Sequence, residues 1–482
     1  MPSRFYTIET RLNVNSDFVD YLSSILTDYS SIKRKMFHMM TNPNYKTNFK
    51  TPEKFVSFCC KLFKIHSRAV NSLRHEIEGE ISAYFELKKT ELSAVKHKIK
   101  TVKKRILKLK EMIEGLKPKV ILQKVTKFQL KRYRKWKREL FRKQNYLNKL
   151  NNKVKNLRFK IDNHICKICF GTRKLFDKQN RLLLNNYENH QEWYDDFVKN
   201  RDKMMFFSGS KGERLGNLLL NLDFNPETGK FNLKFRKLDT SKIKRAERDN
   251  PDAFATYRGL KFKHLSENVK KILEKHINDC ENKQGLSFRF LRRNCTKWYV
   301  QIIFEESYDD SELETSAKYG VIGLDLNDGF IQLAETNCSG NLIRLEKFDL
   351  KYHGCGNKAK TEMYQILNRI VKYAHSIKKD ISAEDLDFKN TKAYQLKAKS
   401  KKGKKYNRML SAFDYSRYKT LLTDICFNNK VALELINPVN TSKTGIQKYS
   451  DSMKLTSHQA AAFVIARRHQ GFKDKYIKKK NK

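Results

Sequence analysis

Asp325 is the residue whose surroundings most directly indicate chemistry. It follows the apolar run 321–324 and precedes the turn at 327–329, and a second apolar run covers 330–334. We expect two short β-strands joined by this turn. A carboxylate within a buried strand is costly to desolvate unless it has a partner. A divalent metal ion is one such partner, and a hydrogen bond near the turn is the alternative.

More carboxylates follow at the end of a later apolar run, the short strand 380–388, which contains Glu384. Helical and strand patterns surround it: a helix at 361–378, a basic loop at 389–409, a helix at 412–428, a strand at 431–438 and a helix at 456–468. A hairpin followed by helix, strand, helix, strand and helix, with acids at strand ends, is an RNase H-like layout. Two carboxylates and a third ligand there would hold two divalent ions about 3.5–4 Å apart, for attack of water on a phosphodiester. Mg²⁺ suits such oxygen ligands.

The charge of the chain indicates its partner. The 482 residues include 101 Lys and Arg against 52 Asp and Glu, so the formal net charge is 101 − 52 = +49. Such an excess predicts binding to nucleic acid. The 39% hydrophobic content argues against a simple packing protein of ribosomal or chromatin type, because the chain can fold a real core. No apolar run is long enough to span a membrane, no signal peptide is expected, and nine cysteines without a regular framework favour a reducing, cytoplasmic location.

The region from about 16 to 195 reads as helical, and its clearest part is an antiparallel hairpin at 92–157. Apolar residues repeat every three or four positions from Val95 to Leu116, and a second such seam runs from Tyr133 to Leu157. The sequence Gly115-Leu-Lys-Pro118 predicts the break between the two helices. The seams most simply pair within one chain, which predicts a monomer or a weak dimer.

The outward faces of this hairpin are basic. Arginine and lysine interleave with aromatic residues there, which suits a surface that follows a nucleic-acid backbone and stacks on bases; a solvated coiled-coil face is the alternative. The predicted nucleic-acid contacts are Lys131, Arg132, Tyr133, Arg134, Trp136 and Arg138, together with Arg467 and Arg468 at the end of the last helix.

Between about 204 and 307 the pattern changes to short strands. Alternating or apolar runs at 218–222, 230–235, 286–291 and 298–304 predict a small antiparallel β domain with a helix near 264–279. The strand-like segment 4–14 could belong to it, which would make the helical region an insertion. The acidic segment 309–315 is the expected linker to the last domain.

A zinc site is not expected from the cysteines. Cys166-Lys-Ile-Cys169 is a single CxxC, and zinc needs four ligands. Cys280, Cys295 or His164 could complete a site in space, but two core thiols are the favoured interpretation.

Several motifs resemble those of TnpB proteins, the transposon-encoded RuvC-type nucleases related to compact type V CRISPR effectors. The resemblance is strongest from 319 to 472 and extends upstream to the segments 167–176 and 214–217. The motifs are Gly-Leu-Asp325-Leu, Ala-Glu384-Asp-Leu-Asp, Asn437-Pro-Val-Asn-Thr441-Ser-Lys-Thr-Gly445, Lys448-Tyr449 and His458-Gln-Ala-Ala-Ala-Phe-Val-Ile-Ala-Arg-Arg.

The resemblance implies an α+β multidomain protein. Its parts would be an antiparallel wedge-like β domain (1–14 and 200–316), an inserted basic helical recognition domain (15–199) and an RNase H-like RuvC nuclease domain (317–482). It implies a guide RNA that pairs with double-stranded target DNA to form an RNA–DNA heteroduplex, Mg²⁺ or Mn²⁺ as cofactor, and use within a prokaryotic cytoplasm. Asp325 and Glu384 would be the first two metal ligands.

Two departures from the family pattern affect the predicted site. Gly445 stands where the first zinc-ribbon cysteine would be and no cysteine follows Cys426, so we expect no zinc ribbon. The third acidic motif is replaced by Thr-Ser-His458-Gln, which makes His458 the predicted third ligand, with Asp451 or Glu434 as alternatives.

The leading functional prediction is an RNA-guided DNA endonuclease with a two-metal site. An RNA-guided DNA-binding protein that cuts poorly or not at all is the first alternative. A cut-and-paste transposase with a similar core is the second.

Overall fold

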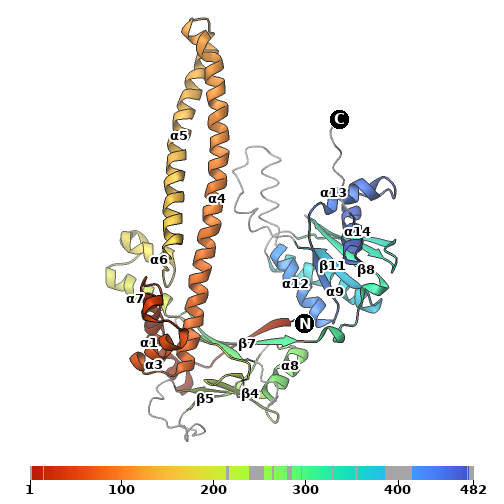
Figure 1. The fold of residues 1–482 in the computed structure, drawn as a ribbon. Coiled ribbons are helices and arrows are strands. Elements are labelled where there is room, and N and C mark those ends of the chain that lie inside the picture. The colour runs from red at the N-terminus through yellow and green to blue at the C-terminus, as the bar shows by residue number, and fades with distance from the viewer. Residues whose placement is uncertain are drawn as a thin grey trace. The chain divides into compact units, whose positions relative to one another are not determined.

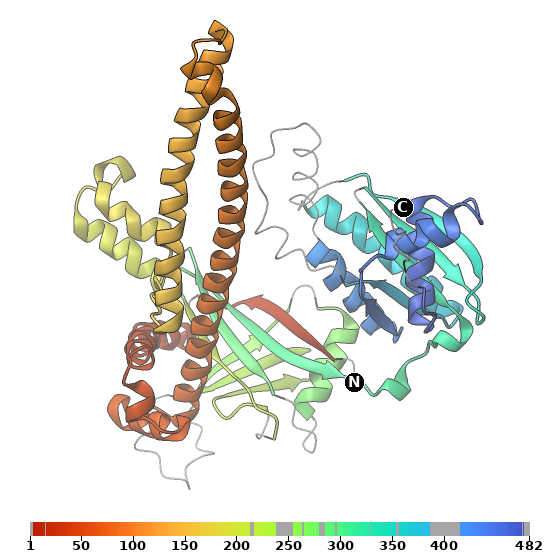
Figure 2. The same cartoon turned by 45° about the horizontal axis from the view of Figure 1, so that its top comes forward.

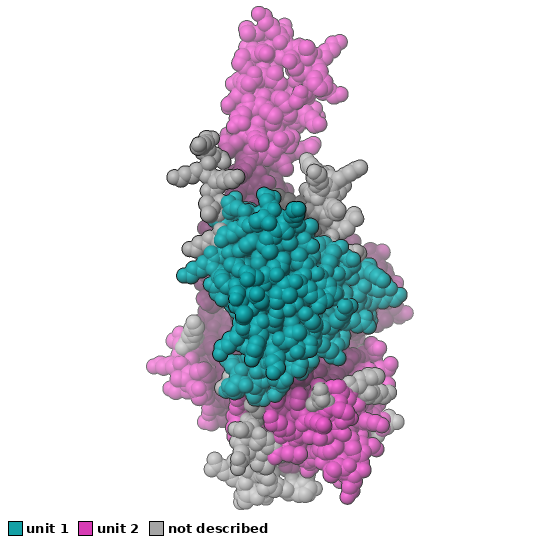
Figure 3. All heavy atoms as spheres, turned by 90° about the vertical axis from the view of Figure 1, so that its right-hand side faces the viewer, with its two compact units in different colours: residues 1–4, 307–482 teal, residues 5–306 magenta. Residues whose placement is uncertain are grey.

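A computed structural model gives the fold. It describes residues 3–14, 16–212, 216–237, 254–262, 265–278, 285–294, 296–327, 329–352, 356–385, 415–474 and 476. The chain divides into two compact units, one made of residues 5–306 and the other of residues 1–4 and 307–482 (Figure 3). Arg214, Cys280, Cys295 and the basic loop 389–409 lie outside the described residues.

Most of the first unit's helices follow one another between its first two strands. They are α1 (Asp17–Met40), α2 (Tyr45–Asn48), α3 (Pro52–Phe63), α4 (Ser67–Ile121), α5 (Lys127–Asp162), α6 (Arg173–Asp177) and α7 (His190–Arg201), with 3₁₀ turns at Lys178–Arg181 and Leu183–Asn185. The helical region predicted at 16–195 is therefore present.

The predicted hairpin is the pair α4 and α5, which lie side by side along α5, while α4 continues beyond it (Figures 1 and 2). The apolar seam is buried as the heptad spacing predicts, with Val95, Val102 and Ile106 packed against Leu150 and Leu157. Ion pairs from Arg105 to Glu139 (2.9 Å) and from Lys153 to Glu91 (2.7 Å) join the helices and fix their antiparallel register.

The predicted helix break at Gly115–Pro118 is wrong. Helix α4 continues through Pro118 to Ile121, and the turn follows at Leu122. Pro118 has no amide to bond the Glu114 carbonyl, and α4 accommodates this loss because only three helical residues follow Pro118 and because the buried seam holds the helix as far as Ile113. Helix α5 then begins with a reciprocal capping box between Thr126 and Gln129.

Seven strands among the described residues of the first unit form two sheets. The strands are β1 (Ser3–Arg11), β2 (Met204–Phe207), β3 (Leu220–Asn225), β4 (Lys230–Arg236), β5 (Phe254–Leu260), β6 (Ser287–Arg293) and β7 (Lys297–Ser307). One sheet has the order β1-β7-β6-β2 and the other β3-β4-β5. The segment predicted at 4–14 therefore pairs with β7, and the helix predicted near 264–279 is α8 (Glu267–Asn278). β2 and β5 were not predicted.

In the second unit, the described residues form a five-stranded mixed sheet. Its strands are β8 (Val321–Asn327), β9 (Phe330–Thr336), β10 (Leu342–Asp349), β11 (Asp380–Glu384) and β12 (Leu433–Ile436), in the order β10-β9-β8-β11-β12. β8, β9 and β10 pair antiparallel, whereas β11 runs parallel to both β8 and β12. The predicted order of hairpin, helix, strand, helix, strand and helix is confirmed, and β10 is an additional strand.

The two faces of this sheet carry different helices. Helices α9 (Asn357–Ser376) and α12 (Tyr415–Asn428) pack on Ile322, Leu324, Ile381 and Ala383. Side chains alternate along a strand, so Gly323, Asp325 and Glu384 belong to the opposite face. Helix α14 (Ser457–His469) covers that face, preceded by α13 (Thr441–Gly445) and a π-helical turn at Ile446–Ser450.

Helix α14 comes unusually close to β8. A Cβ atom added at Gly323 would lie 2.2 Å from the carbonyl oxygen of Ala462 and 2.6 Å from the nitrogen of Ala466. The helix permits this approach because the run Ala460–Ala462 and Ala466 are small and fully buried. No described helix of either unit is both long and apolar enough to cross a bilayer.

We expect Gly323→Ser to destabilise the second unit by about 1–3 kcal/mol, because any side chain at this position pushes α14 away from β8. Gly356→Ser in the same unit is the matched control. Gly356 caps the start of α9 with open space around its Cβ position, and serine is at least as good a helix cap as glycine. Denaturant unfolding measures both variants, and equal stability of the two would contradict the close contact.

Candidate functional site

Asp325 lies on β8 beneath helix α14, and only 7% of its surface is exposed. The side-chain amide of Asn327 donates a hydrogen bond to its Oδ2 (2.8 Å), and Nδ1 of His458 lies 3.2 Å from the same oxygen. Burial raises the pKa of Asp325, and both contacts oppose that rise. The hydrogen bond near the turn, which the sequence left as an alternative to a metal, is therefore present.

Glu384 is the last residue of β11, the parallel strand next to β8. Ala383 pairs with Leu324, so Glu384 ends its strand beside Asp325 on the same sheet face. Burial raises the pKa of Glu384 to about 7, and the negative charge of Asp325 adds to the rise. The Thr441 hydroxyl donates a short hydrogen bond to Glu384 and lowers that pKa, as does the positive charge of Arg468.

His458 reaches Asp325 from the first turn of α14. That helix begins with a capping box between Thr456 and Gln459, which fixes its first turn. The imidazole packs edge-on against Phe330 at 5.2 Å between ring centres, and 48% of the side chain remains exposed. The structure thus places Asp325 next to His458 and, on the neighbouring strand, next to Glu384, with His458 on the solvent side.

The other end of α14 is fastened to the sheet by three consecutive residues. Arg468 donates to the carbonyl oxygens of Asn437 (2.9 Å) and Val439 (3.1 Å). His469 lies 3.2 Å from the carboxylate of Asp380. These contacts fix the helix that carries His458 and hold Arg468 near Glu384.

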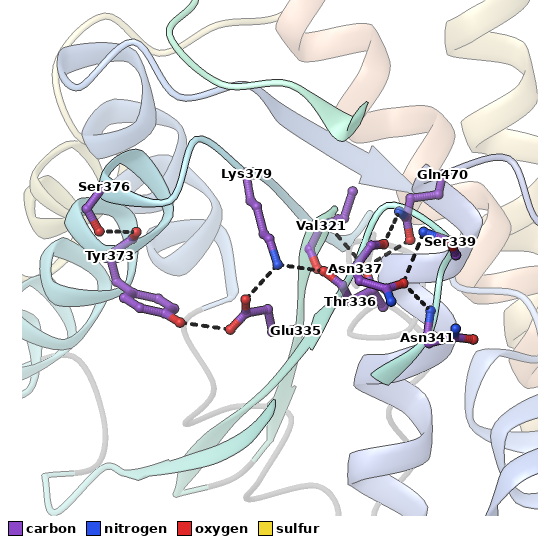
Figure 4. Close-up of polar contacts among 10 residues, drawn as sticks. All are labelled: Val321, Glu335, Thr336, Asn337, Ser339, Asn341, Tyr373, Ser376, Lys379 and Gln470. Atoms are coloured by element: carbon purple, nitrogen blue, oxygen red, sulfur yellow. Dashed lines mark hydrogen bonds and ion pairs between the residues drawn. The ribbon is translucent and has the colours of Figure 1, made fainter. Parts of the chain in front are cut away.

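Gln470 completes the attachment through a polar network at the start of β8 (Figure 4). The Thr336 hydroxyl lies 2.9 Å from Oε1 of Gln470 and 3.0 Å from the Val321 carbonyl oxygen, and its single proton can be donated to either acceptor. Beside it, the buried Lys379 ammonium contacts Glu335 at 2.6 Å and the Thr336 carbonyl at 2.8 Å. A buried charge pair of this kind requires additional hydrogen bonds to compensate for desolvation, and the Tyr373 hydroxyl supplies one to Glu335.

The donor chemistry of Asp325 and Glu384 fits a divalent cation. Both are oxygen ligands of the type that Mg²⁺ and Mn²⁺ prefer. Their pKa values are raised by burial and, for Glu384, by the neighbouring carboxylate, so a cation would relieve an electrostatic cost already present. Across the part of the chain that the structure describes, however, no cluster of three or more His, Cys, Asp or Glu side chains is arranged to hold a metal.

The alternative third ligands lie elsewhere. Glu434 is on the edge strand β12, its side chain is 56% exposed, and its carboxylate lies 2.6 Å from Nδ1 of His469. Asp451 is exposed and follows the π-helical turn. Neither contacts Asp325 through any interaction recorded for the described residues, so His458 is the best placed of the three.

The predicted nucleic-acid residues of α5 are mostly exposed. Lys131, Arg132, Arg134 and Arg138 are exposed and Trp136 is half-buried. The structure differs from the predicted nucleic-acid contact at Tyr133. Its ring is only 8% exposed within the hairpin, because Tyr133 belongs to the apolar seam. It offers no free face for a base.

The two arginines of α14 already have protein partners. Arg467 pairs with Asp474 (2.9 Å), donates to the carbonyl of Gly340 (2.7 Å) and stacks over Phe472. Arg468 holds the segment after β12, as described above. Their contact with nucleic acid stays a prediction.

The CxxC pair lies just after the hairpin. Cys166 is buried and Cys169 is half-buried, and both are free thiols. Burial raises the pKa of Cys166 to about 11, which disfavours the thiolate that a metal would need. The ring of His164 instead packs near Phe85. This environment agrees with core thiols.

Sequence reasoning did not assign roles to Asn327 and Thr441. Asn327 is two residues beyond Asp325, where a side chain on the same sheet face can reach back to it. Thr441 is 57 positions from Glu384 in the sequence. Its place in the segment 437–445, which resembles a TnpB motif, was the sequence signal that could have indicated it.

Comparisons with known proteins add little to this geometry. No family model and no curated protein matches the chain. Among solved structures, RuvC of T. thermophilus in complex with a Holliday junction substrate is similar at 15% sequence identity, over 31% of this chain and 90% of that chain, with a TM-score of 0.22. A similarity this low carries no inference about function, so the site must be judged by its own residues.

We expect Thr441→Val to raise the pKa of Glu384 above about 7, because the hydroxyl that favours the ionised carboxylate is lost. Infrared titration of the carboxyl band measures this, with Glu384→Gln to assign the band. Thr444→Val is the control, since the Thr444 hydroxyl is fully buried and makes no hydrogen bond with the described residues. Equal shifts in both variants would contradict the assignment.

Metal-free protein should also lose stability relative to Glu384→Gln as the pH rises from about 4.5 to about 7. A raised pKa in the folded state means that the fold favours protonated Glu384, so the stabilisation is complete below the unfolded value of 4.5 and is lost above about 7. The predicted loss is up to about 3 kcal/mol. Urea unfolding in a chelator measures it, and parallel pH profiles of the two proteins would contradict it.

Proposed function

We propose that the second unit is an RNase H-like nuclease domain of the RuvC type and that Asp325 and Glu384 hold its divalent metal. The observation that carries this proposal is that Asp325, buried on β8, lies beside Glu384, half-buried at the end of the adjacent parallel strand β11, with the pKa values of both carboxyl groups raised. The sheet order β10-β9-β8-β11-β12, with helices on both faces, supports the RNase H-like assignment.

The residues around the carboxylates have separable roles in this proposal. A bound divalent cation would supply charge for phosphodiester hydrolysis and polarise the attacking water. Asn327 and Thr441 orient the two carboxylates through hydrogen bonds. His458, held by the first turn of α14 and half-exposed, would act as the third ligand by turning its Nδ1 from Asp325 to the metal.

We further propose that cleavage is directed to DNA by a guide RNA. Two observations support this finer proposal: the exposed basic residues of α5, which suit a nucleic-acid backbone, and the motifs around Asp325, Glu384, Thr441 and His458 that resemble TnpB proteins. In this arrangement the first unit supplies the wedge-like and recognition domains.

A guided DNA-binding protein with impaired cleavage is the second candidate. The observation that favours it is the lack of a ready-made three-ligand cluster among the described residues. A histidine in place of a third carboxylate also lowers the negative charge available to hold a second cation. Cleavage assays separate the two candidates directly.

Asp325→Ala and Glu384→Ala should each reduce Mg²⁺-dependent cleavage by more than about 100-fold, since even the hydrogen-bonding partners of metal ligands are worth 10- to 100-fold. The assay uses full-length protein with its co-purified nucleic acid. Asp385→Asn is the matched control, because this neighbouring carboxylate is exposed and paired with Lys419. Cleavage that survives both alanine variants would refute the site, whereas guide-dependent binding without cleavage at any Mg²⁺ or Mn²⁺ concentration would establish the second candidate.

Protein purified from cells that carry the flanking DNA of its gene should contain one discrete RNA with a constant scaffold and a variable end. Sequencing the bound RNA tests this. A mixture of unrelated RNAs would mean that the charge of +49 collects polyanions without selection, and the guided proposal would fail.

A further inference from the structure

The outer end of the α4–α5 hairpin has a strong excess of positive charge. Residues 115–138 contain ten lysines and arginines and no aspartate or glutamate. Two ion pairs join the helices nearer the base, Lys153–Glu91 and Arg105–Glu139. The excess of positive charge at the outer end indicates an external anionic partner. We call residues 117–138 the hairpin end.

Large apolar side chains are exposed at the same place. Ile121, Leu122 and Phe128 are 69%, 64% and 67% exposed, and none belongs to the buried seam between the helices. Leu122 caps α4, and Phe128 lies in the first turn of α5. Exposed apolar groups within a strongly basic surface mark a binding site rather than a solvated tip.

Three planar side chains form a ladder along one face of α5. The Arg132 guanidinium lies 5.6 Å from the ring centre of Phe128 and 5.1 Å from that of Trp136. Their spacing of four residues places them on successive turns of the same helix face. The outermost member, Phe128, keeps most of its surface exposed, so the ladder ends in an open aromatic ring.

We propose that the hairpin end binds unpaired nucleotides of a nucleic acid by stacking a base on this ladder. Bases stack on aromatic rings and on guanidinium planes, while flanking lysines and arginines contact the phosphates. An anionic membrane fits less well, because a helix that lies on a membrane needs an apolar face along its length. This inference takes nucleic acid as the partner class from the proposed function, and it assigns to that partner the three residues Phe128, Arg132 and Trp136.

The test measures binding of full-length, nucleic-acid-free protein to an end-labelled single-stranded oligonucleotide of mixed sequence and to the matching duplex. Phe128→Ala removes the open ring and no charge. It should weaken single-strand binding by about 5- to 100-fold, leave duplex binding nearly unchanged and leave the salt dependence of binding unaltered. Lys131→Ala should instead weaken binding to both forms and reduce the salt slope by about 1.

Phe141→Ala is the control, because Phe141 is an equally exposed phenylalanine (65%) on α5 outside the ladder. If Phe128→Ala binds the single strand as Phe141→Ala does, stacking is refuted. Binding to anionic phosphatidylserine vesicles in preference to the oligonucleotide would also refute it.

The same variants separate this inference from the nuclease proposal. Asp325→Ala should abolish cleavage and keep Phe128-dependent binding. If no cleavage is found but Phe128→Ala still loses the single strand, the nuclease proposal fails and the stacking site stands. If cleavage depends on Asp325 but Phe128→Ala binds normally, only the stacking site fails.

Discussion

The contact between α14 and β8 at Gly323 is the constraint on which the candidate site depends. With the carbonyl of Ala462 only 2.2 Å from a Cβ position at Gly323, the helix and the strand lie closer together than any residue other than glycine would permit. That separation lets a side chain as short as histidine reach Asp325 from the first turn of α14. The last turn is then tied down by Arg468, His469 and Gln470, so the helix that carries His458 has little freedom to slide or turn.

The two carboxylates of the site are less well compensated by positive charge than a neighbouring buried carboxylate of the same sheet. Glu335 is buried too, but it is matched by the ammonium of Lys379 and the Tyr373 hydroxyl. The hydrogen bonds from Asn327 and Thr441 and the weaker attraction of His458 and Arg468 do not offset the effect of burial on Asp325 and Glu384, and their pKa values rise. The sheet therefore contains a buried acid matched by a cation, Glu335, and two acids, Asp325 and Glu384, whose carboxyl pKa values are raised, which is the pattern expected where stability is given up for ligand binding.

The sequence predicted the parts of this fold that depend on local pattern. Heptad spacing identified the hairpin seam, and the apolar runs around Asp325 identified β8 and β9. It failed where tertiary packing overrides local preference: Pro118 continues a helix that the buried seam holds in place, and β5 and β10 were missed because their side chains are only partly buried and alternate weakly. Tyr133 fitted both a seam and a stacking surface, and only the packing of α4 on α5 decides for the seam.

The Glu384–Thr441 contact shows a second limit, because no pattern links two residues 57 positions apart. The positive net charge of the chain helps to identify the cause of the raised pKa of Glu384. A protein of charge +49 favours ionised carboxylates through its average field, yet salt screens that field beyond about 8–10 Å. The raised pKa of Glu384 must therefore come from its immediate surroundings, namely its burial and Asp325. Neutralising the lysines of the hairpin with bound polyanion should leave it in place, whereas a cation between the two carboxylates should remove it.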